Sequence, residues 1–202
     1  MAIFNSVRKD FNPEDYMPEL RELEDELKRE KYRARYNSTL RSTISTLVIV
    51  AAVAILVATL WMPVLQIYGS SMTPTLQEGT IVLSVKNSDF QVGDIVAFYY
   101  NNKILIKRVI AGPGQWVSID DDGNVFVDDV QLEEPYITEK ALGECDIEMP
   151  YQVPEGRYFM MGDHRGVSVD SRNSAVGCIS KDEVVGKITY GIWPMSEFGS
   201  VE

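Results

Sequence analysis

Cysteine and histidine are scarce in this sequence of 202 residues, which holds two cysteines and one histidine. Cys145 and Cys178 stand alone, without the spacing typical of metal ligands, so the sequence predicts neither a metal centre nor a disulfide-rich scaffold. No motif predicts a cofactor. Whether the two cysteines form a disulfide or stay separate thiols is open at this level, because a bridge requires their Cα atoms to lie within about 7 Å.

A surplus of basic charge is also missing. The formal net charge is −11, and residues 1–41 carry nine basic and nine acidic side chains, so the whole acidic excess falls in residues 42–202. A nucleic-acid partner requires a basic surface that holds phosphates, and this distribution excludes one. The acidity of the second part is explained most simply by solubility.

Charge of either sign disappears between Arg41 and Glu78. Within this gap, residues 44–65 form an almost wholly apolar run of about 22 residues, long enough to cross a hydrocarbon layer of roughly 30 Å as a helix. A cleavable secretory signal fits poorly, because about 40 residues precede the run, far more than a normal basic leader. We therefore predict a transmembrane anchor over residues 42–65.

The flanking charges predict the orientation of this anchor. Residues 28–41 contain six basic side chains and one acidic side chain, whereas residues 66–85 contain no lysine or arginine. Because a basic flank stays in the cytoplasm, the sequence predicts a single-pass protein of the cell membrane with residues 1–41 inside and residues 66–202 outside. The lipid bilayer is then one of its partners.

The predicted cytoplasmic part has two sections. Residues 1–16 are expected to form a flexible arm. From about Pro18 to Tyr36 the chain is dense in charged residues and leucine, with acids first and bases later, an order that suits the dipole of a helix. We expect a solvated helix there, without chemistry of its own.

Beyond the anchor the hydrophobic pattern changes to one typical of strands. Short runs rich in β-branched and aromatic residues are separated by turn-forming residues. The expected strands cover residues 80–85, 94–100, 103–110, 157–161 and 184–193. Asn101-Asn102 is typical of a tight hairpin. The predicted fold class is therefore mainly β, with two packed antiparallel sheets behind the charged helix and the anchor, and with residues 131–153 as an irregular excursion.

Ser71, a few residues beyond the predicted anchor, is a candidate nucleophile. A serine hydroxyl needs a neighbouring group that takes its proton. His164 is expected to have a structural or solvent-facing position. Lys107 lies in an expected strand with Leu105 and Val109 on the same face, and burial there would lower the pKa of its amine. Taken alone, Lys107 is also typical of a strand lysine that reaches solvent, and Ser71 of a turn serine.

Three sequence blocks follow the anchor in this order: Ser71-Met72-Thr73-Pro74-Thr75-Leu76, Ile106-Lys107-Arg108-Val109-Ile110, and Gly162-Asp163-His164-Arg165 with Ser168-Val169-Asp170-Ser171-Arg172. Together they resemble the bacterial type I signal peptidases, also called leader peptidases. The resemblance implies that Ser71 attacks the scissile carbonyl, and that Lys107 is general base and then general acid. It also implies a hydrogen bond between Ser168 and the lysine amine. The side chains it implies as braces of the site are Asp163, Arg165, Asp170 and Arg172.

The transition state also needs donors for its developing negative charge. The backbone N–H of Ser71 is the expected first donor. Some family members add a serine hydroxyl two positions earlier, but this chain has Gly69 there. The second donor is then a backbone N–H, a water molecule or the hydroxyl of Ser70.

The resemblance also implies the substrate, an exported preprotein with small residues one and three positions before the cut. Such a chain binds in extended form along a sheet edge. The residues expected to line its shallow pockets are Leu65, Ile67, Met72, Leu76, Leu105 and Ile106. Preproteins are thus the expected protein partners, met near the secretion translocon.

Two other functions share parts of this pattern. Self-cleaving repressors related to the Lex family use the same Ser/Lys chemistry, but no basic helix-turn-helix pattern precedes Ser71, and the anchor argues against a repressor. A non-catalytic anchored envelope β module, or an inactive relative, would require neither Ser71 nor Lys107. The sequence therefore favours a membrane-anchored serine endopeptidase that removes signal peptides.

Overall fold

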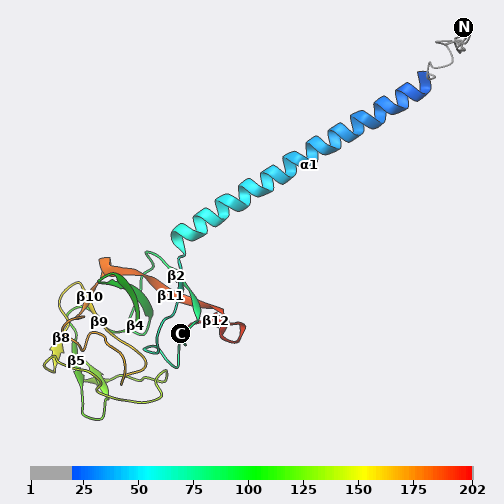
Figure 1. The fold of residues 1–202 in the computed structure, drawn as a ribbon. Helices are drawn as coiled ribbons and strands as arrows, with labels where there is room; N and C mark the ends of the chain where they lie inside the picture. The colour runs from blue at the N-terminus through cyan, green and yellow to red at the C-terminus, as the bar shows by residue number, and fades with distance from the viewer. Residues whose placement is uncertain (1–19, 202) are drawn as a thin grey trace, which may run out of the picture. The chain divides into compact units, whose positions relative to one another are not determined.

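The computed structural model describes residues 20–201 of the chain. They fall into two compact units, of which the first ends at Ile55 and the second begins at Leu56. One long helix, α1 (Leu20–Trp61), precedes a domain built from β-strands (Figure 1). The predicted fold class, mainly β with two antiparallel sheets, is confirmed. The predicted flexible arm, residues 1–16, lies outside the described residues.

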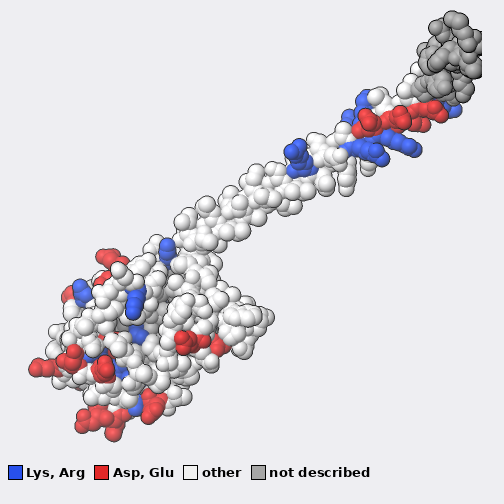
Figure 2. Space-filling model, in the orientation of Figure 1, with Lys and Arg blue, Asp and Glu red and all other residues white. Residues whose placement is uncertain are grey.

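Helix α1 is continuous over 42 residues, where the sequence predicted a charged helix and a separate anchor. Its charged side chains gather toward its N-terminal end, and a long stretch without charge follows (Figure 2). No residue of α1 is buried, and the helix is long and apolar enough to cross a membrane. A helix that exposes apolar side chains all round fits a lipid environment.

Helix α1 ends earlier than the anchor that the sequence predicted. The predicted span reached Leu65, but α1 ends at Trp61, and β1 (Val64–Gln66) follows at once. Pro63 provides the physical reason, because the residue before a proline disfavours helical dihedrals and proline has no N–H to continue the helix. Leu65 pairs with Val82 and belongs to the β domain.

Two antiparallel sheets build this domain. The larger has the order β1-β2-β11-β3-β4-β9-β10, with β12 paired to β11, and the smaller has the order β7-β6-β5-β8. The remaining strands of the larger sheet are β2 (Ile81–Val85), β3 (Ile95–Tyr100), β4 (Lys103–Ala111), β9 (Arg157–Met161), β10 (Ile179–Ser180), β11 (Val184–Trp193) and β12 (Gly199–Ser200). The smaller sheet contains β5 (Trp116–Ile119), β6 (Val125–Val127), β7 (Val130–Gln131) and β8 (Tyr151–Gln152). Two short 3-10 helices are η2 (Lys181–Glu183) and η3 (Met195–Glu197).

The five predicted strands are all present, with bounds that differ by at most one residue. The predicted hairpin is also present, since Tyr100 pairs with Lys103 and Asn101 has a left-handed φ of 50° that asparagine tolerates. The strands of the smaller sheet were not predicted, because runs of two to four residues are too short to show an alternating pattern. Residues 132–150 contain neither strand nor helix, as expected for the excursion.

Strand β4 runs from an exposed edge into the core. Its first two residues are exposed and its last five are buried. Val109 packs in a cluster with Phe98 and Met160, and Ile110 packs in a second cluster with Phe159. The buried half of β4 is therefore held firmly on both faces.

Cys145 and Cys178 are separate thiols in the structure. Cys178 is buried, and this burial raises the pKa of its thiol to about 11. The Sγ atom of Cys145 is 3.8 Å from the carbonyl oxygen of Ile147. The sequence left the disulfide open, and the fold supplies none between these two residues.

Candidate active site

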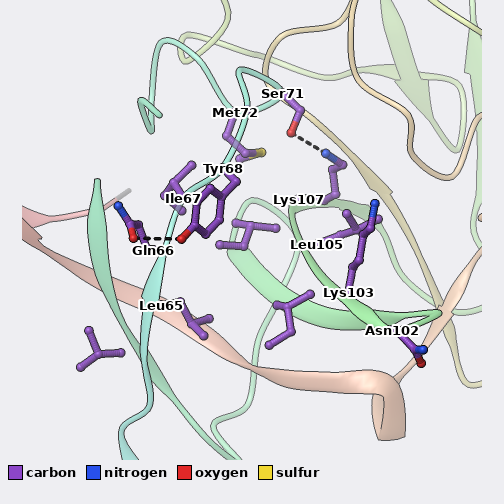
Figure 3. A pocket seen from close by; sticks show the side chains of 14 residues that line it. Leu65, Gln66, Ile67, Tyr68, Ser71, Met72, Asn102, Lys103, Leu105 and Lys107 are labelled. Carbon is purple, nitrogen blue, oxygen red and sulfur yellow. Dashed lines mark hydrogen bonds between the residues drawn. The ribbon is translucent and has the colours of Figure 1, made fainter. Parts of the chain in front are cut away.

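Ser71 and Lys107 lie against each other. The Nζ atom of Lys107 is 2.6 Å from the Oγ atom of Ser71, which is hydrogen-bond distance. Figure 3 shows the two side chains pointing toward one another. Lys107 comes from β4, and Ser71 comes from the loop between β1 and β2. The fold alone brings together two residues that are 36 positions apart.

The side chain of Lys107 is almost wholly buried. The residue is 2% exposed, and burial disfavours the ammonium form, which lowers its pKa from 10.5 to about 8. Of the smaller influences, Asp170 raises this pKa, Arg172 lowers it and Asp163 raises it. At pH 7.5 a pKa of about 8 leaves about a quarter of the amines neutral, against about one in a thousand for an ordinary lysine.

A cavity of about 840 Å³ opens beside this pair. One wall is β1 with the residues after it, and the other is the start of β4 (Figure 3). Five of the six predicted pocket residues line it: Leu65, Ile67, Met72, Leu105 and Ile106. The prediction for Leu76 is wrong. Its backbone N–H bonds to the carbonyl of Met72, and this turn carries the Leu76 side chain into the core beside Val82.

Both walls present a strand edge to the cavity. Within residues 20–201, β1 pairs only with β2. Residues 103–107 of β4 pair only with β3, because β9 pairs with β4 from Arg108 onward. Free backbone N–H and C=O groups along such edges can bind an extended polypeptide.

Arg108 forms a buried ion pair that sequence reasoning did not assign. Its Nε atom donates to one oxygen of Asp163 at 2.9 Å, and its terminal nitrogen donates to the other at 2.7 Å. Asp163 also accepts a hydrogen bond from the hydroxyl of Thr75 at 2.6 Å. Asp163 thereby connects β4, next to the candidate base, with the loop that carries Ser71.

Asp170 and Arg172 form a second buried pair. Two nitrogens of Arg172 donate to the two oxygens of Asp170, both at 2.8 Å. Asp170 also accepts the backbone N–H of Gly162 at 2.9 Å. Burial alone would raise the pKa of the Asp170 carboxyl, but Arg172 and the hydrogen bonds outweigh burial and hold that pKa below its ordinary value. A stable negative charge therefore sits near Lys107.

Arg165 pairs with Glu134, which comes from the irregular excursion. One terminal nitrogen of Arg165 contacts Oε1 of Glu134, and the other donates to Oε2 at 3.2 Å. The ring of Tyr136 lies over Arg108, with 3.8 Å between the guanidinium carbon and the ring centre. Sequence reasoning assigned neither Glu134 nor Tyr136 to the site. No spacing distinguishes Glu134 among the 30 acidic residues of the chain.

Ser168 does not have its expected contact. The resemblance implied a hydrogen bond to Lys107, but the structure has none between these two side chains, and the buried Ser168 hydroxyl helps instead to hold the pKa of the Asp170 carboxyl low. A Cβ atom on Gly162 would lie 2.2 Å from the Ser168 hydroxyl oxygen and 2.4 Å from the Ser71 carbonyl oxygen, so these groups already pack closely around Gly162. Ser168 thus lies beside the backbone of Ser71.

The residues before Ser71 shape its loop. Gly69 lines the cavity and has a φ of 81°, a left-handed value that favours glycine. The carbonyl of Ser70 accepts hydrogen bonds from the backbone and hydroxyl of Thr73, at 3.2 and 2.8 Å. His164 is half-buried. Its backbone N–H donates to the Ser71 carbonyl at 3.1 Å, and its Nδ1 atom is 3.0 Å from the Thr73 hydroxyl, so it has a structural position.

This geometry suits one kind of chemistry. A hydroxyl that is hydrogen-bonded to an amine of lowered pKa can be deprotonated and can attack a carbonyl carbon. The adjacent cavity, with two free strand edges, is suited to an extended chain. The β-rich fold and this site fit the class of serine hydrolases that act on polypeptides.

Comparison with known proteins identifies the family. Residues 40–193 match the family described as signal peptidase, peptidase S26. Signal peptidase IB of Staphylococcus aureus is 34% identical over 152 residues, which cover 65% of this chain and 78% of that protein. Thylakoidal processing peptidase 1 of Arabidopsis thaliana is 35% identical over 145 residues, which cover 63% of this chain and 41% of that protein.

One solved structure is also similar to part of this chain. A crystal structure of a signal peptidase I from Enterococcus faecalis V583 is 30% identical to this chain. It covers 50% of this chain and 98% of its own length, with a TM-score of 0.42.

The chain belongs to the signal peptidase family, peptidase S26. The resemblance seen in the three sequence blocks is thereby confirmed, and the protein is an enzyme of the signal peptidase I class.

Proposed function

We propose that this protein is a membrane-anchored serine endopeptidase that cleaves signal peptides from exported preproteins, with Ser71 as nucleophile and Lys107 as general base. One observation carries the proposal: the buried Lys107 amine, with its lowered pKa, lies 2.6 Å from the Ser71 hydroxyl at the wall of an open cavity. A base must lie within hydrogen-bond reach of the proton it takes and must be neutral near the working pH.

The reaction proceeds in two stages. Neutral Lys107 takes the proton of the Ser71 hydroxyl while the oxygen attacks the scissile carbonyl, and the resulting ammonium gives a proton to the departing amine. Water then attacks the acyl-enzyme, with Lys107 again as base. The backbone N–H of Ser71 is one donor to the oxyanion. The hydroxyl of the exposed Ser70 is a candidate second donor, because Gly69 has no side-chain hydroxyl.

The buried ion pairs hold Ser71 and Lys107 in place. Asp163 links Arg108 to Thr75 in the nucleophile loop, and Asp170 binds the backbone of Gly162. Arg165 and Arg172 neutralise buried carboxylates and keep the segment after β9 against that loop. Because these buried contacts already orient the two side chains, the reacting atoms need little rearrangement.

The cavity selects an extended chain with small side chains. The substrate lies between the free edges of β1 and β4, and the apolar residues beneath it form shallow pockets. These residues are Leu65, Ile67, Met72, Leu105 and Ile106. Bulky side chains one and three positions before the cut are excluded by size.

The membrane brings enzyme and substrate together. Helix α1 crosses the bilayer with residues 1–41 on the cytoplasmic side, and the domain from β1 onward lies outside. Ser71 follows the last helical residue, Trp61, by ten positions, so the site is tethered near the bilayer surface. A preprotein anchored by its own apolar segment, near the secretion translocon, then has a high effective concentration.

Cleavage is expected to depend steeply on pH. Because the amine must be neutral and its pKa is about 8, kcat/KM for a preprotein should increase about tenfold per pH unit below pH 8 and level off above it. Initial rates of the purified full-length protein in detergent, from pH 5 to pH 10, would measure this. A flat profile between pH 6 and pH 9 would contradict the role of Lys107.

The orientation can be tested with the natural cysteines. Cys145 is partly exposed in the β domain, whereas Cys178 is buried with a raised thiol pKa and should react slowly. We expect a membrane-impermeant maleimide to label Cys145 in intact spheroplasts.

The matched control is Ser6→Cys in a Cys145→Ala background, which should be labelled only after the membrane is permeabilised. Labelling of Ser6→Cys in intact spheroplasts, with Cys145 protected, would reverse the proposed orientation.

A further inference from the structure

Two side chains of the irregular excursion reach back to the charged residues around the site. Glu134 and Tyr136 lie in a stretch without strand or helix, yet the Glu134 side chain is 1% exposed. Pro135 between them fixes its own backbone φ. The Tyr136 hydroxyl donates to Oε1 of Glu134 at 3.2 Å. The two side chains are therefore fixed relative to each other, although the surrounding backbone is irregular.

Glu134 holds the turn that contacts the nucleophile. It binds the fully buried guanidinium of Arg165 with both of its carboxylate oxygens. The Nε atom of Arg165 donates to the carbonyl of Gly162 at 3.1 Å. In the same turn, the backbone N–H of His164 donates to the carbonyl of Ser71 at 3.1 Å. A displacement of Arg165 would thus move the groups that fix the Ser71 backbone.

Tyr136 covers the residue next to the base. Its ring centre is 3.8 Å from the guanidinium carbon of Arg108, a favourable cation–π distance. Arg108 is buried, and Asp163 binds it through two hydrogen bonds. Burial raises the pKa of the Tyr136 hydroxyl, so it stays a neutral donor. The ring keeps water away from the Arg108–Asp163 pair, one residue along β4 from Lys107.

We propose that the segment Glu134-Pro135-Tyr136 is a positioning element for the catalytic pair. Tyr136 shields the Arg108–Asp163 pair beside Lys107, and Glu134 holds Arg165 and its turn against Ser71. This inference rests on the proposed function, because it takes Lys107 as the base. Both residues act through the two arginines, so they are positioning residues.

Loss of the Tyr136 ring has a defined electrostatic consequence. Water would enter beside Arg108, and the hold of Arg108 on Asp163 would weaken. Asp163 already raises the pKa of Lys107, so a less neutralised Asp163 favours its ammonium form further. The groups that face Lys107 are Ser71, Asp163, Asp170 and Arg172, with Lys103 in the same cavity. Those that face Tyr136 are Glu134, Arg165, Arg108 and Asp163.

The test compares Tyr136→Ala with Tyr136→Phe, which keeps the ring. The full-length protein is assayed in detergent on a preprotein, and kcat and KM are measured from pH 5 to pH 10. For Tyr136→Ala we expect the apparent pKa of kcat to rise by about one, which lowers kcat at pH 7 about tenfold with little change in KM. Tyr136→Phe keeps the ring over Arg108 and loses only the hydrogen bond to Glu134, so it should shift the profile much less than Tyr136→Ala. Tyr190→Ala, exposed on β11, is the matched control for loss of a tyrosine ring.

Two further variants keep the result decisive. If Tyr136→Ala fails to fold, Tyr136→Leu retains an apolar side chain without the aromatic attraction and should shift the profile in the same direction. Ser71→Ala is assayed in parallel, because retained activity there would refute the proposed function itself. With Ser71→Ala inactive, an unchanged pH profile in Tyr136→Ala or Tyr136→Leu, or an equal shift in Tyr136→Phe, would overturn the positioning role.

Discussion

Replacement of Lys107 by arginine is expected to reduce cleavage of a preprotein by about 10⁴-fold or more, or about 5 kcal/mol of transition-state stabilisation. Arginine keeps the positive charge, but its guanidinium stays protonated at every working pH and cannot take the Ser71 proton. The buried site, 2% exposed, also leaves little room for the larger group. The loss should persist at pH 10, because higher pH does not restore a base.

Single-turnover assays on the purified full-length protein would measure this loss, with melting temperature as the check on folding. The matched control is Lys181→Arg, an exposed lysine paired with Asp89 outside the cavity, which should keep wild-type activity. Full activity of Lys107→Arg would contradict its assignment as the base.

Ser71→Ala is expected to have an effect of similar size, because it removes the atom that forms the acyl-enzyme. Residues that act as a unit are not additive, so the double variant with Lys107→Ala should be no slower than either single variant. The mutation removes one oxygen atom at a loop position, so the melting temperature should change little. Acyl-enzyme trapping and preprotein cleavage would both be lost.

The control is Ser196→Ala, at an exposed serine in η3. This variant should cleave the preprotein at the wild-type rate. Equal cleavage by wild type and Ser71→Ala would remove Ser71 as the nucleophile. Absence of cleavage by the folded wild-type protein would instead favour an inactive relative, a non-catalytic anchored β module.

The long strands could be predicted from sequence, and the short ones could not. Residues 103–110 alternate over enough positions to show a strand, and Asn101-Asn102 fixes the register of the hairpin. The strands of the smaller sheet are stabilised by their neighbours rather than by a pattern of their own. At the end of α1, apolar composition alone extended the predicted anchor to Leu65, although Pro63 ends the helical conformation before it.

In the candidate site, too, some residues could be predicted from sequence and others could not. Ser71 and Lys107 were assigned because their residue types and sequence blocks match a known chemistry. Leu76 was misplaced because an apolar residue beside a nucleophile can face either the cavity or the core, and only the turn at Met72 decides which. Glu134 and Tyr136 were missed because their partners, Arg165 and Arg108, lie 31 and 28 positions away.

The sequence by itself determined the long uncharged apolar run and the β-rich domain and indicated the candidate reactive side chains, because each depends on local composition or spacing. Only the tertiary structure decided the surroundings of Lys107. Burial and Arg172 lower the pKa of its amine, whereas Asp170 and Asp163 raise it, and the fold brings these three residues from 56 to 65 positions further along the chain. Desolvation and charge proximity are properties of three-dimensional packing, so the chemistry of this lysine exists only in the folded domain.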